Sequence, residues 1–558
     1  MARTISIGAQ GYADIREHGD FYVDKTGLIA QWWRSADPVT LICRPRRFGK
    51  TLNMSMLECF FSLSYADRPD LFRGLSIWDN MELRGEQGSW PVISISLAGT
   101  KGARLEDVEL RICERIAQAW RSQSRYIDPE GLPSDEADLL LGRTTVVSPQ
   151  RAPSSLLRLC ELLHGATGQK AIVLLDEYDT PMQEAWMGGF WDGLAEFIRS
   201  LFNNTFKTNP FLARAMLTGI TRVNRESIFS DLNNLAVVTT TTRQYESFFG
   251  FTEDETFAAM DEMGMTNRAE VKEWYDGFTF GDIEDIYNPW SITNCLKYGK
   301  IEPYWANTSS NALASKLIRE GDPQLKADFE TLLQGSSVLK ALDEQVAFSE
   351  LGRKPGAVWA LLLANGYLKV AGRRPLDEGG TYELRLTNRE VLHSFDSMVG
   401  GWFEQSSTYY NGFVQALRTG DLDAMNGYMN DVALDTFSLF DSGTRPAESE
   451  PERFYHGFVL GLLVELRGRY IVRSNRESGY GRYDVMLEPL DPTRDDGIVM
   501  EFKVFNPRRE SNLEETVAAA KAQIAEKRYA ATLEARGLSA DRIRSYGFAF
   551  QGKRVLIG

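Results

Sequence analysis

Short apolar runs alternate with longer segments of helical periodicity over the first half of the chain. The runs with the length and residue types of buried strands are Val39–Cys43, Val92–Leu97, Ala171–Leu175 and Leu212–Leu217. The segments with helical spacing between them include Leu105–Arg121 and Ser154–His164, and 122–153 is predicted as an exposed insertion. Because strands that alternate with helices form parallel sheets covered on both faces, this half predicts an α/β parallel-sheet core.

The pattern changes in the second half of the chain. Between residues 249 and 440 the strand signals fade, and helical patterns such as Ala312–Arg319, Val358–Leu368 and Phe413–Tyr428 predict a mainly helical region with small β elements. Residues 441–451 are polar and carry two prolines and one glycine, which is typical of a linker. Residues 452–558 predict one further compact α/β domain.

Composition sets limits on the function. The 558 residues are 43% hydrophobic and 25% charged, without an apolar run of membrane-spanning length, so we expect no membrane partner. Five scattered cysteines and only four histidines argue against a disulfide framework or a structural zinc site and favour the cytoplasm. The net charge of −15 opposes a surface that coats nucleic acid as a whole, but the segment from Pro451 onward has a small excess of basic residues.

A candidate phosphate-binding loop, Arg44-Pro45-Arg46-Arg47-Phe48-Gly49-Lys50-Thr51, follows the first strand run and precedes a helix-like segment. In such a loop Gly49 permits close approach of the backbone, Lys50 reaches the β- and γ-phosphates, and Thr51 ligates Mg²⁺. The first position is usually Gly, and here it is Arg44. We predict that ATP binds to Arg44, Arg46, Arg47, Phe48, Gly49, Lys50 and Thr51. The three arginines either strengthen this binding or pack against acids of a lid.

Acidic residues follow the third apolar run, in Asp176-Glu177-Tyr178-Asp179. We assign Asp176 to Mg²⁺ through water and Glu177 to the attacking water; the alternative is a core strand with an acidic turn. The fourth run ends at Thr218, a candidate sensor of the γ-phosphate, with Arg222 or Arg225 as phosphate-facing cations. The alternative there is an ordinary turn with surface arginines.

A second candidate centre lies near the C-terminus. The order predicted for this domain is helix 453–466, strands 470–474, 483–487 and 498–505, helix 513–533 and strand 546–550. Glu501 and Lys503 are two apart on one strand, so they share a face, and Asp484 on the preceding strand can join them. Two carboxylates can hold Mg²⁺ for water attack on a phosphodiester while Lys503 orients the water. The alternative is a Glu501–Lys503 ion pair without metal.

Residues around this second centre are less specific. Arg482 either lies near a phosphate or belongs to a tight turn. A helix-borne acid would complete the carboxylate set, for which Glu452, Glu465 and His456 are candidates, although we expect all three to be structural.

Ordered motifs along the chain carry a family resemblance. They are Tyr22–Thr26, Arg44–Thr51, Leu175–Pro181, Leu217–Gly219, Ser230–Leu235, Phe249–Glu255, Trp274–Phe278 and Tyr287–Ser291. In this order the chain resembles the prokaryotic AAA-ATPase-like proteins that carry a C-terminal PD-(D/E)xK nuclease-like domain. The resemblance implies that Arg44 is a normal variant of the loop and that Asp484, Glu501 and Lys503 form a nuclease core. It also implies that Gln523 and Tyr529 contact DNA or another ligand.

The resemblance implies a P-loop NTPase core in an AAA-like ATPase domain over 1–248, a lid or winged-helix-like region over 249–440, the linker 441–451 and the nuclease-like domain over 452–558.

The first hypothesis for the function is an ATP-binding and ATP-hydrolysing module that controls an Mg²⁺-dependent nuclease acting on nucleic acid, with DNA as the first candidate. The second is a sensor or signalling NTPase whose C-terminal domain binds nucleic acid or a partner without cleaving it, and the third is a scaffold in which neither site is active. A homo-oligomer is compatible with all three.

Overall fold

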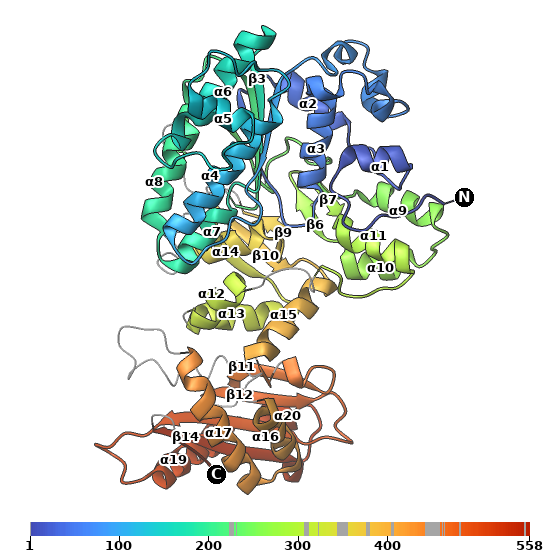
Figure 1. The fold of residues 1–558 in the computed structure, drawn as a ribbon. Coiled ribbons are helices and arrows are strands. Elements are labelled where there is room, and N and C mark those ends of the chain that lie inside the picture. The colour runs from blue at the N-terminus through green and yellow to red at the C-terminus, as the bar shows by residue number, and fades with distance from the viewer. Residues whose placement is uncertain are drawn as a thin grey trace. The chain divides into compact units, whose positions relative to one another are not determined.

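The chain forms two compact units (Figure 1). The N-terminal unit comprises Met1–Ser309 with Leu339–Val391, and the C-terminal unit comprises Ser310–Val338 with Leu392–Gly558. The region 249–440, predicted as one mainly helical segment, is thus divided between them. The computed structural model describes residues 2–221, 228–229, 232–305, 312–321, 323–342, 355–374, 380–402, 407–440, 458–459, 461–462, 464–478, 481–551 and 554–558.

A five-stranded parallel sheet with the order β2-β3-β4-β1-β5 is the centre of the N-terminal unit. Its strands are β1 (Val39–Cys43), β2 (Val92–Ser96), β3 (Ala171–Asp176), β4 (Leu212–Gly219) and β5 (Leu235–Val238). The first four coincide with the apolar runs predicted as strands. The fifth was not predicted, because four residues at a sheet edge give a weak periodic signal.

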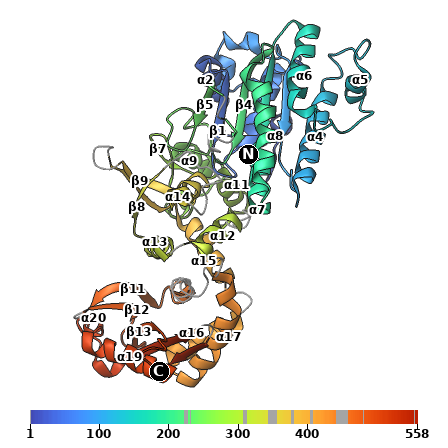
Figure 2. The same cartoon turned by 90° about the vertical axis from the view of Figure 1, so that its left-hand side faces the viewer.

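Helices cover both faces of this sheet (Figures 1 and 2). On one face lie α2 (Gly27–Ser35) and α3 (Lys50–Phe61), and on the other lie α4 (Leu105–Ser122), α6 (Ala152–Thr167) and α8 (Trp191–Phe202). Trp32 of α2 and Leu57 of α3 join Ile42, Ile172 and Met216 of the strands in one buried cluster. Because strand side chains alternate between faces, a sheet covered on both sides needs continuous apolar strands, as the sequence has. The predicted α/β core is confirmed.

Smaller elements complete the N-terminal unit. The helices are α1 (Tyr12–His18), α5 (Ser134–Leu140), α7 (Thr180–Gly188), α9 (Glu253–Glu262), α10 (Arg268–Tyr275), α11 (Pro289–Tyr298) and α14 (Pro355–Ala364). The strands form two small sheets. One is the pair β6 (Phe278–Phe280) and β7 (Ile283–Ile286), and the other has the order β8-β10-β9, with β8 (Val338–Ala341), β9 (Leu368–Arg373) and β10 (Thr381–Leu386). Side chains of α9, α10 and α11 share a second buried cluster that includes Met260, Val271 and Ile292.

The C-terminal unit contains a mixed sheet with the order β11-β12-β13-β14-β15. Its strands are β11 (Tyr470–Ser478), β12 (Gly481–Pro489), β13 (Gly497–Val504), β14 (Ile543–Gln551) and β15 (Arg554–Ile557). The β13–β14 pair is parallel and the other pairs are antiparallel. Helix α19 (Leu513–Lys527) packs against the sheet through Ile524, which lies in one cluster with Met486 and Val499.

Two long helical predictions are interrupted in the structure. The helix predicted over 513–533 ends at Lys527, because Arg528 adopts a left-handed φ of 52°, and α20 (Ala531–Glu534) follows. The pattern Phe413–Tyr428 is split at Gly420, with a φ of 77°, into α16 (Ser407–Thr419) and α17 (Leu422–Phe440). The other helices are α12 (Ala312–Glu320), α13 (Pro323–Leu333) and α15 (Arg389–Trp402). The predicted linker 441–451 lies outside the described residues.

Two asparagines of α17 cap the outer edge of β15. The side chain of Asn426 accepts from the backbone N–H of Ile557 at 2.8 Å and donates to its carbonyl at 2.8 Å. Asn430, one helical turn further, makes the same pair of bonds with Val555 at 2.9 and 2.7 Å. An open sheet edge is a site of unwanted strand pairing, so α17 closes this edge and is an integral part of the C-terminal unit.

We expect Asn426→Ala to destabilise the edge by about 1–3 kcal/mol, because the substitution leaves a buried donor and acceptor of Ile557 without partners. Hydrogen exchange of the C-terminal peptide, followed by mass spectrometry, should become faster. Gln415→Ala, an exposed change on α16, serves as the control. Equal exchange in the two variants would contradict the capping role.

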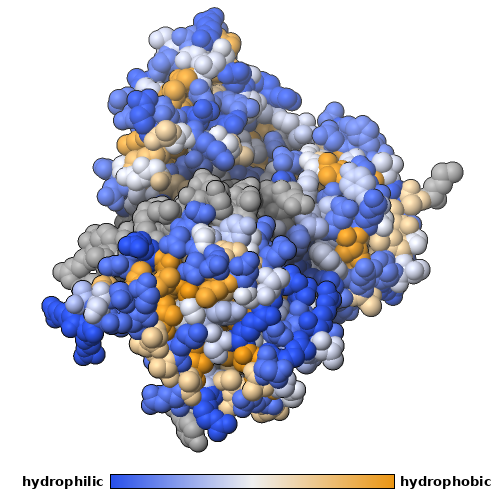
Figure 3. Space-filling model, turned by 90° about the horizontal axis from the view of Figure 1, so that it is seen from below, coloured by the Kyte–Doolittle hydropathy of each residue, from blue (hydrophilic) through white to orange (hydrophobic). Residues whose placement is uncertain are grey.

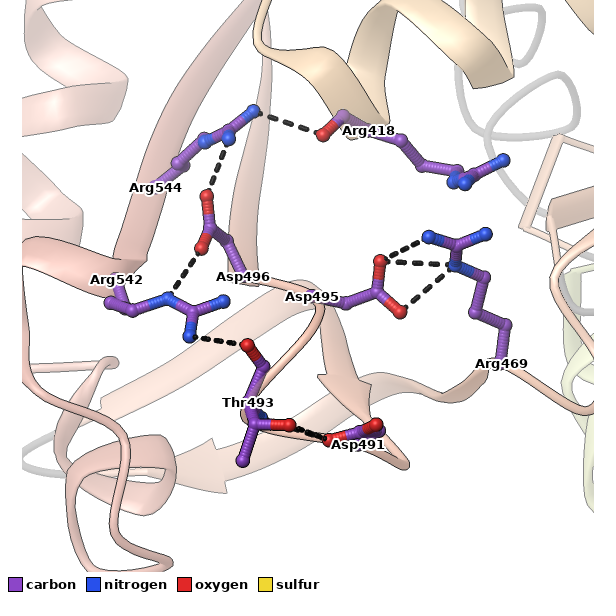
Figure 4. A network of polar contacts seen from close by, with 8 residues as sticks. All are labelled: Arg418, Arg469, Asp491, Thr493, Asp495, Asp496, Arg542 and Arg544. Carbon is purple, nitrogen blue, oxygen red and sulfur yellow. Dashed lines mark hydrogen bonds and ion pairs between the residues drawn. The ribbon is translucent and has the colours of Figure 1, made fainter.

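Arginine–aspartate contacts fix the connection between β12 and β13 (Figure 4). Asp495 accepts from Nε of Arg469 at 3.0 and 2.9 Å, and Asp496 accepts from Nε of Arg542 at 2.8 Å and from Arg544. Arg542 also donates to the carbonyl of Pro492 at 2.8 Å. These contacts tie the start of β11 and the start of β14 to the turn that leads into β13.

Surface hydropathy agrees with the compact folds. In the described part of the chain we find no helix with the length and hydropathy required of a membrane span. The face drawn in Figure 3 mixes hydrophobic side chains with hydrophilic ones.

Candidate active sites

The loop after β1 has the geometry of a phosphate cradle. Gly49 precedes α3 with a φ of 75°, a conformation that favours glycine. The ammonium group of Lys50 donates to the carbonyl oxygens of Arg44 at 2.9 Å and Pro45 at 2.7 Å. The side chain is buried, and burial lowers the pKa of Lys50. An anion in the loop would give this buried cation a stronger partner than the two carbonyls.

The acids of β3 meet the loop at the end of the sheet. The carboxylate of Asp176 accepts from the hydroxyl of Thr51 at 2.7 Å and from the hydroxyl of Thr218. Strand β4, which carries Thr218, lies between β1 and β3, so its tip bridges the loop strand and the acidic strand. A hydroxyl and a carboxylate side by side are oxygen ligands of the kind Mg²⁺ prefers, so Thr51 and Asp176 fit this ion.

Glu177 follows Asp176 in a constrained conformation. Its φ is 54°, in the left-handed region that non-glycine residues seldom occupy, and the hydroxyl of Thr180 donates to its carboxylate at 3.1 Å. Burial and the charge of Asp176 raise the pKa of Glu177. A carboxylate with a raised pKa is a better proton acceptor, which suits the role predicted for this side chain.

Two further residues of the same segment hold the tip of β4. Asp179 accepts from the backbone N–H groups of Ile220 at 2.9 Å and Thr221 at 3.0 Å, and the hydroxyl of Tyr178 donates to the carbonyl of Thr221 at 2.5 Å. A Cβ at Gly219 would lie 2.5 Å from the Tyr178 ring, so the close approach requires glycine. The run Asp176–Asp179 was the available signal for this clamp, which the sequence analysis missed. Arg222 and Arg225 lie outside the described residues.

The side chain of Arg44 is not in the cradle, contrary to the prediction. Its guanidinium lies 4.5 Å from the centre of the Phe280 ring and donates to the carbonyl of Thr239. The residue is fully buried, and burial lowers the pKa of Arg44 to about 10. The alternative of packing against lid acids is not what the structure has either, because aromatic rings and carbonyl oxygens surround this cation. Arg44 instead joins the loop to the β6–β7 hairpin.

The other loop side chains go to different elements. Arg46 donates to the side chain of Gln183 in α7 at 3.1 Å, and the Arg47 guanidinium lies 4.3 Å from the centre of the Trp290 indole. Phe48 is buried, with its ring centre 4.7 Å from that of Phe278, so its side chain is structural and only its backbone faces the cradle. Trp290 was not among the predicted site residues, although it lies in the motif Tyr287–Ser291.

The second centre forms where β12 and β13 pair. Val485 is opposite Met500, and the next residues on each strand are Asp484 and Glu501. The Asp484 carboxylate accepts from the backbone N–H of Phe502 at 2.7 Å. The predicted convergence of two carboxylates on adjacent strands is therefore present.

Gln523 of α19 connects the members of this centre. Its amide nitrogen donates to one oxygen of Glu501, and its amide oxygen accepts from the ammonium of Lys503 at 2.8 Å. The amide nitrogen also lies 3.1 Å from the Tyr529 hydroxyl. The resemblance implies that Gln523 and Tyr529 contact DNA or another ligand; in the structure Gln523 contacts Glu501 and Lys503, and Tyr529 contacts Gln523.

One of the two carboxyl oxygens of Glu501 lacks a hydrogen-bond partner. The residue is 4% exposed, and its Oε2 atom is buried without a hydrogen-bond partner. Burial and the charge of Asp484 raise the pKa of Glu501 to about 8, and burial raises the pKa of Asp484. These two carboxylates, with the buried Oε2 of Glu501 that has no hydrogen-bond partner, fit a divalent cation, which would compensate both charges.

We expect Glu501→Gln to stabilise the metal-free protein at pH 8 by about 2–4 kcal/mol and to leave its stability unchanged below pH 4.5. The folded-state pKa of Glu501 is raised, so ionisation favours the unfolded chain as pH rises from the ordinary value of 4.5 to about 8. Melting temperatures in the presence of a chelator at several pH values measure this difference. Glu526→Gln, exposed on α19, is the control, and a pH-independent gain for Glu501→Gln would contradict the assignment.

The remaining candidates do not join this centre in the described residues. Glu465 is exposed, and Glu452 and His456 lie outside the described part of the chain. Arg482 belongs to β12, and its side chain is likewise outside what the structure describes. No group of three or more His, Cys, Asp and Glu suited to a metal ion occurs among the described residues. Among the described residues, this centre therefore contains two carboxylates and a lysine.

Two family models match separate parts of this chain. Residues 6–229 match the family model described as "Predicted AAA-ATPase", and residues 450–558 match that of the PD-(D/E)XK nuclease superfamily. A protein of Azotobacter chroococcum mcd 1, named "Uncharacterized protein in vnfD 5'region", is 28% identical over 400 residues, which cover 71% of this chain and 69% of that protein.

The fold and the two centres define a nucleotide-binding P-loop module followed by a nuclease-like domain. The chain accordingly has the architecture of the AAA-ATPase-like proteins with a C-terminal PD-(D/E)XK nuclease-like domain, as its motifs predicted.

Proposed function

We propose that the N-terminal unit binds and hydrolyses ATP and that this reaction controls an Mg²⁺-dependent nuclease in the C-terminal unit. The observation that carries the proposal is that Asp484 and Glu501 lie next to each other on strands β12 and β13. The Oε2 atom of Glu501 is buried there without a hydrogen-bond partner. A buried carboxyl without a partner costs free energy and is retained where a site uses it.

In the ATPase reaction the loop residues bind and orient the phosphates. Lys50 exchanges two carbonyl oxygens for phosphate oxygens, and Thr51 with Asp176 would hold Mg²⁺. Glu177 accepts a proton from the attacking water, for which its raised pKa is suited. Asp179 and Tyr178 keep the tip of β4 next to these acids, so that Thr218 can hold Asp176 in place.

In the nuclease reaction Asp484 and Glu501 would hold the divalent cation, which supplies Lewis-acid polarisation of a phosphodiester and activation of water. Glu501 must lose its proton before it can ligate. Lys503, held by Gln523, donates to the water or to the developing negative charge. Nucleic acid, with DNA as the first candidate, is the partner that this chemistry serves.

A second candidate function is a sensor NTPase whose C-terminal unit binds nucleic acid or a partner without cleaving it. The small carboxylate set favours this alternative, because among the described residues only Asp484 and Glu501 are placed to hold a metal ion, and no group of three or more His, Cys, Asp and Glu occurs there.

Cleavage assays with purified protein separate the two functions. Single-stranded DNA, duplex DNA and RNA are incubated with Mg²⁺, with and without ATP, and the products are resolved by size. The nuclease predicts products that a chelator abolishes. ATP binding without products on any substrate, at pH 7 and at pH 9, would favour the sensor.

A further inference from the structure

Adjacent arginines at the apex of the phosphate loop turn to two different helices. Arg46 contacts Gln183 of α7, the helix that begins directly after Glu177, Tyr178 and Asp179. Arg47, with a φ of 68°, places its guanidinium over Trp290 at the start of α11. In the view of Figure 1, α7 lies to the left of α3 and α11 to its right. The acidic residues therefore lie on the same side of the phosphate loop as the Arg46 side chain, and Trp290 lies on the opposite side.

The acidic flank sets the direction of a bound nucleotide. Thr51, Asp176 and Glu177 serve the terminal phosphates and the attacking water, so the γ-phosphate faces β3 and β4. The nucleoside must then leave the loop toward the Arg47 flank. An aromatic ring is the group that a base needs there, because every base has a π-face that can stack.

Trp290 is fixed relative to the loop by Asn288. The buried Asn288 side chain accepts from the backbone N–H of Trp290 at 2.9 Å and of Ser291 at 3.2 Å, capping α11. Its amide nitrogen lies 3.4 Å from the carbonyl of Arg46. One residue thus joins the loop backbone to the backbone of the indole, so the ring keeps its place when a ligand enters.

We propose that the indole of Trp290 is the stacking platform for the nucleobase, an inference that rests on the ATP-binding function proposed above. The base takes the place of the Arg47 guanidinium on the indole face, and the displaced cation moves to the phosphate chain. The base can replace the guanidinium because both groups are planar and stack on the indole, and because Arg47 is exposed and its side chain can rotate. Stacking does not read base edges, so the platform accepts ATP and GTP alike.

The test compares MgATP with inorganic tripolyphosphate, which has the phosphates but no base, by titration calorimetry. Trp290→Leu is expected to weaken ATP binding about tenfold, the loss of one stacking contact, and to leave tripolyphosphate binding within about twofold. Trp290→Phe, which keeps a π-face, should restore most of the ATP affinity. Arg47→Ala should weaken both ligands by a similar factor, because in both complexes the guanidinium has left the indole for the phosphates.

Trp274→Ala is the matched control, because Trp274 is also half-buried in this unit and lies under a guanidinium, that of Arg389, at 4.9 Å. Its ATP affinity should equal that of the wild type. The platform is overturned if Trp290→Leu binds ATP as the wild type does, or if its ATP and tripolyphosphate affinities fall together. If the wild type binds neither ligand, the ATP-binding function itself fails, which is a separate result.

Discussion

Lys503→Met is expected to reduce cleavage by about 10²–10³-fold while nucleotide binding stays unchanged. The ammonium of Lys503 is held at 2.8 Å from the amide oxygen of Gln523, beside Asp484 and Glu501. Methionine keeps the length of the side chain and removes the charge. The loss is therefore in stabilisation of the transition state and not in packing.

Single-turnover cleavage with saturating protein measures this effect. Lys521→Met, at an exposed position of α19, is the matched control and should cleave at the wild-type rate. Gln523→Ala should fall between the two, because Lys503 then keeps its charge but loses its orientation. A Lys503→Met variant with wild-type cleavage would remove this centre from the reaction.

Glu177→Gln is expected to lower ATP hydrolysis by about 10²–10⁴-fold and to leave ATP binding intact. Glutamine preserves the size of the side chain and can still accept the hydrogen bond from Thr180, but it cannot take a proton from water. The raised pKa of Glu177 has burial as its largest cause, and the substitution removes the buried charge without opening a cavity.

Phosphate release and nucleotide affinity are measured on the same preparation. Glu184→Gln, on the neighbouring helix α7, is the control and should hydrolyse ATP normally. Unchanged hydrolysis in Glu177→Gln would assign the proton transfer to another group. A loss of binding together with hydrolysis would indicate that Glu177 supports the loop and not the chemistry.

The sheet of the N-terminal unit was predictable because both of its faces are covered. Its inner strands β1, β3 and β4 are then mainly apolar, and an uninterrupted run such as Ala171–Leu175 gives a clear signal. Two short edge strands, β5 and β15, were harder to predict. Strand β5 has four residues, and β15 is closed by Asn426 and Asn430 from α17, a pairing of polar side chains that no periodicity indicates.

The sequence predicted the main residues of the two sites but not all of their contacts. Spacing alone brings Glu501 and Lys503 to one face, and their charges interrupt an otherwise apolar strand. The hydrogen-bond partners of these residues were harder to predict from the sequence, because Gln523 is brought to them by the packing of α19 on the sheet. Residue type alone does not predict where the side chains of the loop arginines lie. Three cations beside a phosphate site look alike in sequence, but Arg44 is buried against Phe280 while Arg47 lies exposed over Trp290.

We propose that nucleotide bound at Lys50 governs cleavage at Lys503. The direct measurement is cleavage of duplex DNA in Mg²⁺ with and without ATP, by the wild type, Lys50→Ala and Lys503→Met. We predict that ATP changes the wild-type cleavage rate, that Lys50→Ala cleaves at one rate whether or not ATP is present, and that Lys503→Met cleaves about 10²–10³-fold more slowly than the wild type. A wild-type rate that is the same with and without ATP, or a wild-type cleavage rate in Lys503→Met, would contradict this.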